Sequence, residues 1–265
     1  MKKAVSEIWI REDVHMADNS HMADGISTAT DAHFTDSAMT ATDSHITDIV
    51  SSASASSMIG CSLDAFTTAL SAKTSVPGGG GAAALAGALA AALGSMTGNF
   101  TIGKKKYRDN EPRLIQMGQR EEELRRGLLA QIDADAQAFE PLSRAYSIPK
   151  DDPARDETLE KCLYDAAQPP FMILKLSAEA AELASEYADI GSRLMLSDAG
   201  CAAAMAEAAM QAGYLNVLAN TRLMKNRERA GHMNMEAGKI LSRGLRAAEQ
   251  TVHSVTETLG GNTES

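Results

Sequence analysis

The chain has 265 residues, of which 44% are hydrophobic and only 4% aromatic, and its formal net charge is −10. A core made mainly of Ala, Leu and Met is typical of packed helices, whereas sheets prefer β-branched and aromatic residues. The acidity argues against a nucleic-acid partner, and three scattered cysteines outside any C-x-x-C pattern argue against a disulfide framework or a zinc site. We therefore expect an all-α protein in a reducing, cytoplasmic setting.

Residues 1–57 form a low-complexity extension in the sequence. They contain nine acidic and three basic residues, and a hexad repeat places four histidines in H-x-x-D units at His15, His21, His33 and His45. Histidine and aspartate are metal-ligand types, and a short β-solenoid is a second alternative. We expect instead a disordered Ser/Thr/Ala-rich extension, followed by one folded domain over residues 58–265.

Seven helices are predicted in the folded part, separated by short connections. Ser62 is a plausible N-cap for the first helix, a glycine loop at 78–81 precedes the second, and Pro169 with Pro170 separates two others. No segment alternates with the two-residue period of a strand. The expected bundle is antiparallel, and its predicted helices cover residues 63–72, 82–99, 111–146, 154–167, 170–189, 197–223 and 226–259.

An uncharged stretch at residues 76–103 is long enough to cross a membrane, and it contains a near match to a phosphate-binding loop. Polar residues fill its second half, so a buried helix of a soluble protein is the favoured interpretation and no membrane partner is expected. The match at residues 98–104 lacks both the Ser/Thr after the lysine and a preceding strand. It therefore does not predict a nucleotide-binding site.

Two ligand-binding candidates flank this helix. The glycines Gly78, Gly79, Gly80 and Gly81 open it, and a glycine-rich helix start presents free N–H groups to an anion; a plain interhelical turn is the alternative. The cluster of Lys104, Lys105, Lys106 and Tyr107 follows it. This cluster is either a solvated charge run or the receptor for a carboxylate-rich ligand.

Asp135 falls within the apolar stripe of the next helix, and Asp133 lies at the edge of that stripe. Burial should raise the pKa of such a carboxyl, which makes Asp135 a candidate general acid or base. A buried aspartate satisfied by a neighbouring helix is the alternative. Asn216 and Asn220 share a face of a later helix and either contact a ligand or cross-link helices.

Several of these segments together resemble the cyclodeaminase/cyclohydrolase family of folate enzymes. The resemblance rests on five motifs in the same order and spacing, PGGGGAAALAGALAAALGSM (77–96), GKKKY (103–107), IDADAQAF (132–139), SDAGCAAAMAEAA (197–209) and NVLAN (216–220). It implies an all-helical homodimer that acts on folate one-carbon units without a metal or other cofactor. Residues 1–57 lie outside the resemblance.

The resemblance also implies roles for the residues of these motifs. Asp135 would be the acid/base, with Asp133 as its orienting partner or as the true base. The glycine loop and the lysine cluster with Tyr107 would bind the glutamate tail of folate, whether mono- or polyglutamylated. The pterin pocket would be lined by Ser197, Asp198, Asn216 and Asn220. Gly81 stands where many members have Ser, and Ser192 where Asn is more usual, which puts the substrate preference in question.

The first functional hypothesis is cyclisation of 5-formiminotetrahydrofolate to 5,10-methenyltetrahydrofolate with release of ammonia. Its alternative is methenyltetrahydrofolate cyclohydrolase, which opens the same ring with water to give 10-formyltetrahydrofolate. An alternative of another class is a non-catalytic, folate-binding helical protein. The first hypothesis would link the chain to histidine degradation and to a separate formiminotransferase.

Overall fold

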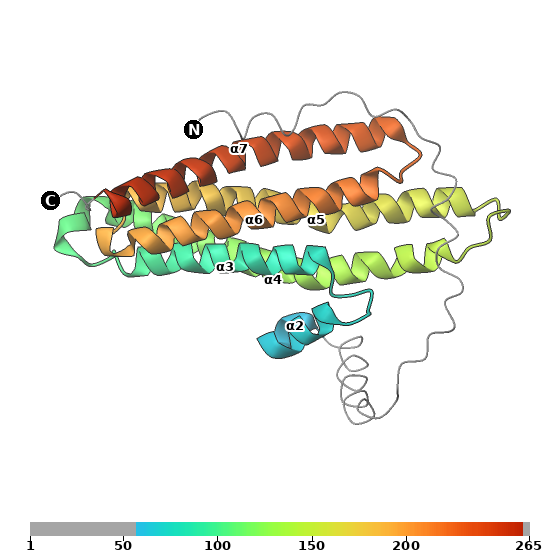
Figure 1. Ribbon diagram of the computed structural model, residues 1–265, viewed down its shortest axis with the longest axis horizontal. Helices are drawn as coiled ribbons and strands as arrows, with labels where there is room; N and C mark the ends of the chain where they lie inside the picture. The colour runs from blue at the N-terminus through green and yellow to red at the C-terminus, as the bar shows by residue number, and fades with distance from the viewer. Residues whose placement is uncertain (1–56, 262–265) are drawn as a thin grey trace. The chain divides into compact units, whose positions relative to one another are not determined.

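The computed structural model describes residues 57–261, and these form an all-α fold with no strand among them (Figure 1). The all-α prediction is thus confirmed, whereas the proposed extension with its hexad repeat lies outside the described residues. Three short 3₁₀ turns, η1 (Met58–Gly60), η2 (Lys105–Asn110) and η3 (Arg193–Met195), accompany the α-helices. The α-helices are α2 (Leu63–Ser71), α3 (Gly79–Asn99), α4 (Glu111–Tyr146), α5 (Arg155–Ile190), α6 (Leu196–Thr221) and α7 (Arg227–Gly260).

The long helices α3 to α7 lie side by side and alternate in direction, as the predicted antiparallel bundle requires (Figure 1). Local signals explain where several of them begin. The Ser62 hydroxyl accepts a hydrogen bond from the Ala65 N–H at the start of α2, and the Asn226 side chain accepts one from the Arg229 N–H at the start of α7. Pro112 lies in the first turn of α4, where its missing N–H is not needed.

Small side chains make up most of the core between α5, α6 and α7. Alanine loses little conformational entropy on burial and lets helix axes approach closely, so such a core depends on well-matched surfaces rather than on large aromatic groups. The largest buried cluster consists of Ala90, Ala167, Leu174, Ala178, Ala181, Ala184, Ala202, Ala203, Ala206, Met210, Val217, Met233, Ala237 and Ala248.

The predicted break between two helices at Pro169 and Pro170 is wrong, because α5 continues through both prolines as one 36-residue helix. Pro170 lacks the N–H that would normally bond the carbonyl of Ala166, four residues earlier. The side chain of Asn220 on α6 replaces it, since its Nδ2 donates to the Ala166 oxygen at 3.1 Å. Both prolines are buried, so packing against α6 also holds the helix together.

Helix α3 is long and apolar enough to cross a membrane by length and composition, but half of its most apolar 18-residue window is buried inside the bundle. It packs against α4, α5 and α6. A core helix of a soluble protein has the same composition, and this packing agrees with that interpretation.

Glu121 of α4 is a fully buried carboxyl group that sequence analysis did not single out. It occupies the space beside Gly94, where any side chain would overlap it, and neither of its oxygens has a hydrogen-bond partner within the described residues. The hydroxyl of Tyr187 nearby is also buried and unpartnered. Burial raises the pKa of Glu121 to about 9, and the charge of Glu179 adds to the rise.

This burial predicts a pH-dependent stability that Glu121→Gln should remove. The unfolded carboxyl ionises above its ordinary pKa of 4.5, while the folded one stays protonated until about pH 9. Stability is therefore lost as the pH rises between these values, by on the order of 3 kcal/mol at pH 7. Urea unfolding at pH 5, 7 and 9 should show a smaller decline for Glu121→Gln than for the wild type. Glu140→Gln, at an exposed position of the same helix, is the control, and an unchanged decline in Glu121→Gln would contradict the prediction.

Candidate active site

The Asp135 carboxylate lies against the first turn of α3. Gly80 leaves the space that the carboxylate fills, because a side chain at this position would overlap it, and the backbone N–H of Gly81 hydrogen-bonds it. The glycines predicted as a loop before the helix mostly form the helix itself, since α3 begins at Gly79 with Gly78 as its N-cap residue. Gly78 offers no capping side chain, so the carboxylate of a neighbouring helix supplies an acceptor to these N–H groups.

The pKa of Asp135 rises as its apolar surroundings predict. Burial raises the pKa to about 6, and the hydrogen bond from Gly81 opposes part of that rise. Ile132 and Phe66, both buried, lie within 3.9 Å of the position that a β-carbon on Gly81 would take. A carboxyl group with a pKa near 6 can both accept and donate a proton close to neutral pH.

Asn216 also lies at this end of α3. Its Nδ2 is 3.2 Å from the position that a β-carbon on Gly79 would occupy, and the same atom donates to the Ala212 oxygen of its own helix at 2.8 Å. Asn220, one turn further along, donates to the carbonyls of Ala166 and Asn216. The structure thus groups Asn216 with the glycines and Asp135, whereas the amide nitrogen of Asn220 cross-links helices.

Asp133 does not pair with Asp135. Positions two residues apart point to different sides of a helix, and the Asp133 carboxylate accepts hydrogen bonds from the Ser57 hydroxyl at 2.5 Å and from the Met58 N–H at 2.7 Å. The structure therefore does not bring the two carboxylates together in the way that the orienting-partner alternative supposed.

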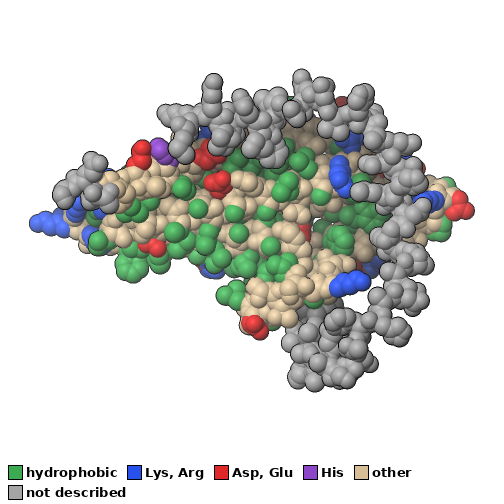
Figure 2. Space-filling model, in the orientation of Figure 1, with side chains coloured by type: hydrophobic (Ala, Val, Ile, Leu, Met, Phe, Trp, Pro, Cys, Tyr) green, Lys and Arg blue, Asp and Glu red, His purple; other side chains and the backbone are tan. Residues whose placement is uncertain are grey.

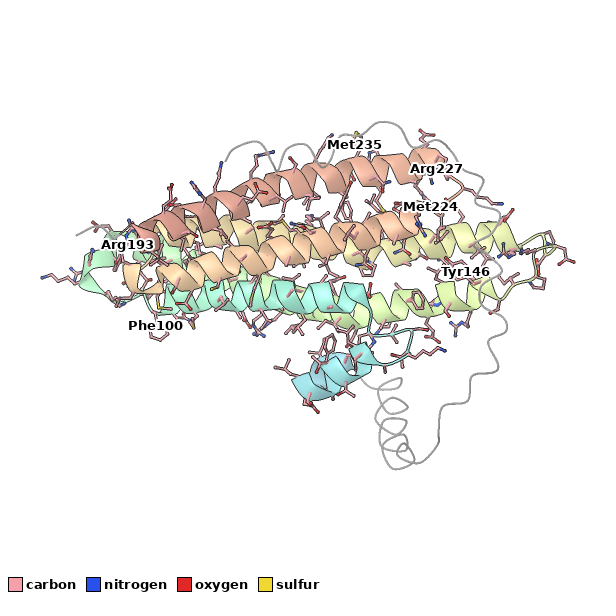
Figure 3. The ribbon with its side chains drawn as sticks, viewed as in Figure 1. Phe100, Tyr146, Arg193, Met224, Arg227 and Met235 are labelled. Atoms are coloured by element: carbon pink, nitrogen blue, oxygen red, sulfur yellow. The ribbon has the colours of Figure 1, made fainter. Side chains whose placement is uncertain are left out.

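The lysine cluster and its neighbours form a second group at the other end of α3. Lys104 Nζ donates to the Ser192 hydroxyl at 3.0 Å, and the Arg193 N–H donates to the Tyr107 hydroxyl at 3.2 Å. That backbone hydrogen bond, with smaller contributions from Ser192 and the charged lysines, lowers the pKa of Tyr107. Figure 3 shows Arg193 and Phe100 at this end of the bundle and Tyr146 and Met224 at the opposite end.

The predicted site residues are therefore divided between the two ends of the bundle. The 21 residues of α3 separate the glycines from Lys104, Lys105 and Lys106 by about 30 Å. Helix α6 separates Ser197 and Asp198, in its first turn, from Asn216 in the same way. Within one chain the straight helix α3 therefore holds the glycines and the lysines too far apart to contact the same folate tail.

A cavity of about 440 Å³ lies elsewhere, between α5 and α7. Its lining includes Tyr164, Phe171 and His232, and the Arg229 guanidinium stacks over the Tyr164 ring at 4.2 Å. None of the predicted site residues lines it. The contact between Asp135 and the start of α3 therefore lies outside this cavity.

A family profile described as formiminotransferase-cyclodeaminase matches residues 62–239. The chain belongs to this family. The match contains α3, Asp135, the lysine cluster and all of α6, so it includes both groups of candidate residues, and it confirms the resemblance inferred from the sequence.

Two kinds of curated relative share this region. The chain is 37% identical over 169 residues to a methenyltetrahydrofolate cyclohydrolase of Methylorubrum extorquens, covering 62% of this chain and 81% of the relative. It is 31% identical over 192 residues to the formimidoyltransferase-cyclodeaminase of Rattus norvegicus, covering 68% of this chain and 36% of the relative. The chain thus matches about a third of the length of the second protein.

The fold matches a solved structure as well. The crystal structure of formiminotetrahydrofolate cyclodeaminase from Thermotoga maritima superposes with a TM-score of 0.67 at 27% identity, covering 76% of this chain and 97% of the other. The bundle described here is therefore the fold of that enzyme.

The contact between Gly80 and Asp135 predicts the effect of Gly80→Ala. The added methyl group has no room beside the carboxylate, so the variant should lose about 2 kcal/mol of stability and most of any folate turnover. Thermal unfolding and turnover of the two candidate folates are the measurements. Gly118→Ala is the matched control, because it places the same methyl group on a helix with nothing within 4 Å. A Gly80→Ala variant as stable and active as Gly118→Ala would contradict the prediction.

Proposed function

We propose that this chain catalyses proton transfer during ring closure or opening at the carbon that bridges N5 and N10 of tetrahydrofolate. Its family and the names of its relatives support an enzyme of the cyclodeaminase or cyclohydrolase kind. The observation that carries the proposal is the position of Asp135, whose carboxyl group has a pKa of about 6 and lies at the glycine-rich start of α3. Acid–base chemistry of this kind needs no cofactor, and we propose none.

The reaction we propose first is the cyclodeaminase reaction. N10 of 5-formiminotetrahydrofolate attacks the formimino carbon and forms the N10–C bond of a five-membered ring. The formimino group reacts in its protonated, amidinium form, so the attack leaves an –NH2 group on the bridging carbon. Asp135 removes the proton from N10 and passes it to this nitrogen, which leaves as ammonia and yields the 5,10-methenyltetrahydrofolate cation. One carboxyl group serves both steps because its pKa allows it to exchange a proton near neutrality.

The second candidate is methenyltetrahydrofolate cyclohydrolase, and the observation that favours it is the 37% identity to a relative of that name. Here Asp135 would accept a proton from the water that attacks the bridging carbon. It would then return the proton to N5 as the N5–C bond breaks, and release of the hydroxyl proton to solvent leaves neutral 10-formyltetrahydrofolate. Both reactions pass through a tetrahedral carbon, so one constellation can serve either.

The cellular setting follows from the first reaction as a proposal. A cytoplasmic enzyme that uses a formimino substrate needs a formiminotransferase to supply it, and the formimidoyltransferase-cyclodeaminase relatives are named for both activities. We propose that a separate protein supplies this substrate, in the context of histidine degradation.

Asp135→Asn tests the catalytic proposal. An amide cannot exchange the proton, so turnover of the true substrate should fall by about 10²- to 10⁴-fold while folate binding is retained. Methenyl absorbance, followed separately with 5-formimino- and 5,10-methenyltetrahydrofolate, identifies the reaction. If the carboxylate is the base, kcat/KM should rise with pH through about 6 in the wild type.

Asp151→Asn, in the exposed connection before α5, is the control for Asp135→Asn. It removes a carboxylate without touching α3. Wild-type turnover by Asp135→Asn, or equal losses in both variants, would contradict the role proposed for Asp135.

We also propose that the enzyme is a homodimer formed through the outer surface of α3 and α6. Helix α3 has no charged residue, and α6 has only Asp198 and Glu207. Large apolar side chains remain exposed along both helices, with Leu89 45%, Phe100 57% and Leu215 64% exposed. Hydrophobic side chains gather along the band where Figure 1 places these helices, and few charged groups interrupt them (Figure 2). A contiguous apolar surface of this kind favours a protein partner.

A two-fold axis perpendicular to α3 would place the α3 helices of the two copies antiparallel to each other. The lysine end of one subunit would then lie beside the Asp135 end of its partner. This arrangement would reunite the glycines, Asp135 and Asn216 with the lysine cluster, Ser197 and Asp198, which a single chain keeps about 30 Å apart.

Subunit complementation tests this dimer. We expect Asp135→Asn and a variant with all three lysines Lys104, Lys105 and Lys106 changed to alanine each to be nearly inactive alone. Unfolded together and refolded as a 1:1 mixture, they should recover about a quarter of wild-type turnover, because half of the dimers are mixed and each mixed dimer has one intact site. Leu89→Glu should produce monomers in light scattering. A mixture no more active than its parents would contradict the shared site.

A further inference from the structure

The segment that precedes α3 is attached to α4, the helix that carries Asp135, through hydrogen bonds to Asp133. The Asp133 Oδ2 accepts a hydrogen bond from the Ser57 hydroxyl, and its Oδ1 accepts one from the Met58 N–H. Hydrogen bonds to an ionised acceptor are stronger than neutral ones, and this pair satisfies both the backbone and the side chain at the start of η1. Asp133 therefore binds two residues that lie 75 and 76 positions before it in the sequence.

The attached segment covers the surroundings of Asp135. Met58 packs against the cluster that contains Phe66 and Ile132. The Phe66 ring lies 3.9 Å from the β-carbon position of Gly81, and the N–H of Gly81 is the group that hydrogen-bonds Asp135. One layer of apolar atoms from η1 and α2 thus lies over the first turn of α3.

Few other contacts hold this cover in place. Helix α2 has nine residues, and only Phe66 and Ala69 are buried. Leu63 is 69% exposed, so much of the apolar surface of α2 faces away from the bundle. A short helix with two buried side chains is not stable by itself in water, and its position therefore depends on the attachment of η1 to Asp133.

We propose that Asp133 is a positioning residue that, through Ser57 and Met58, holds η1 and α2 over the first turn of α3 and keeps water from Asp135. This role replaces the direct catalytic role that the sequence suggested for Asp133. It rests on the proposed function, because it explains how the active carboxyl group keeps its apolar surroundings.

The proposal separates the two aspartates by their chemistry. Asp135 exchanges the proton, and its loss removes the reaction at every pH. Asp133 touches no reacting atom. Its loss admits water to the site but leaves Asp135 and the N–H groups of α3 in place. Better hydration of Asp135 stabilises its charged form, so the pKa of that carboxyl moves from about 6 toward the ordinary value of about 4.

Three variants of the full-length chain test this role: Asp133→Ala, Ser57→Ala and the double variant. In Asp133→Ala and in Ser57→Ala the midpoint of the pH–rate profile near 6 should move down, by about one unit in the former. The value of kcat on the plateau should stay within about tenfold of the wild type, whereas loss of a general base would cost about 10²- to 10⁴-fold. The double variant should be no worse than Asp133→Ala alone, because both changes break the same attachment.

Asp64→Ala is the matched control, since it removes an exposed carboxylate from α2 without touching the attachment, and its profile should be that of the wild type. Ser57→Ala changes an exposed hydroxyl, so it keeps the test valid if Asp133→Ala fails to fold. An unshifted profile in Ser57→Ala, or a plateau kcat in Asp133→Ala as low as in Asp135→Asn, would overturn the proposal.

A measurement without substrate distinguishes this proposal from the proposed function. Carbon-13 NMR titration of the Asp135 carboxyl should show the same downward shift of the pKa in Asp133→Ala and Ser57→Ala, and amide hydrogen exchange of residues 58–71 should become faster in both. If the wild type turns over neither folate, the proposed function fails while these shifts still support the attachment. If turnover is present and the titration is unchanged, the attachment has no effect on Asp135 and the present proposal fails alone.

Discussion

The contact between the Asp135 carboxylate and the first turn of α3 is the interaction on which the site depends. It requires a glycine at position 80, a neighbouring N–H from Gly81 and an apolar cover above them. The helix N-terminus favours a negative charge, while burial disfavours it. Burial is the larger effect and the hydrogen bond from Gly81 offsets part of it, so the pKa of the carboxyl group rises to about 6.

The same packing recurs along α3 and α4 with a different chemical result. Gly80, Gly87 and Gly94 lie seven residues apart, and the side chains that fill the spaces beside them include Asp135, Leu128 and Glu121, seven apart in the opposite direction. Glu121 lies beside Gly94, well beyond the first turn of α3 and its free N–H groups, so nothing offsets its burial and it stays neutral at pH 7. Position relative to the helix end thus separates the two buried carboxyl groups, one with a pKa of about 6 and the other with a pKa of about 9.

Much of the fold could be predicted because its signals are local. Ser62 marks the start of α2, and the apolar stripe that contains Asp135 predicts the raised pKa of this carboxyl group. The same stripe extends back to Glu121, so helical periodicity alone could have identified this residue as a buried carboxyl group. The break in α5 was mispredicted because Asn220, 50 positions beyond Pro170, compensates for the missing N–H. Motif order and spacing carry no distances, so they could not show that one chain keeps the lysines about 30 Å from the glycines, or that Asp133 contacts Ser57 and Met58.

The heptad register of α3 has a consequence for how this bundle can change length. Each residue turns a helix by about 100°, so removing one residue between Gly80 and Gly94 would rotate one end of α3 relative to the other and direct bulkier side chains at the carboxylates of α4. Only insertions or deletions of about seven residues in α3, with an equal change in α4, preserve the contacts of Gly80 and Gly94 with the carboxyl groups of α4. Helix α3 therefore fixes the distance between the two ends of the bundle. We expect the length of α3 to differ among related bundles by whole heptads or not at all.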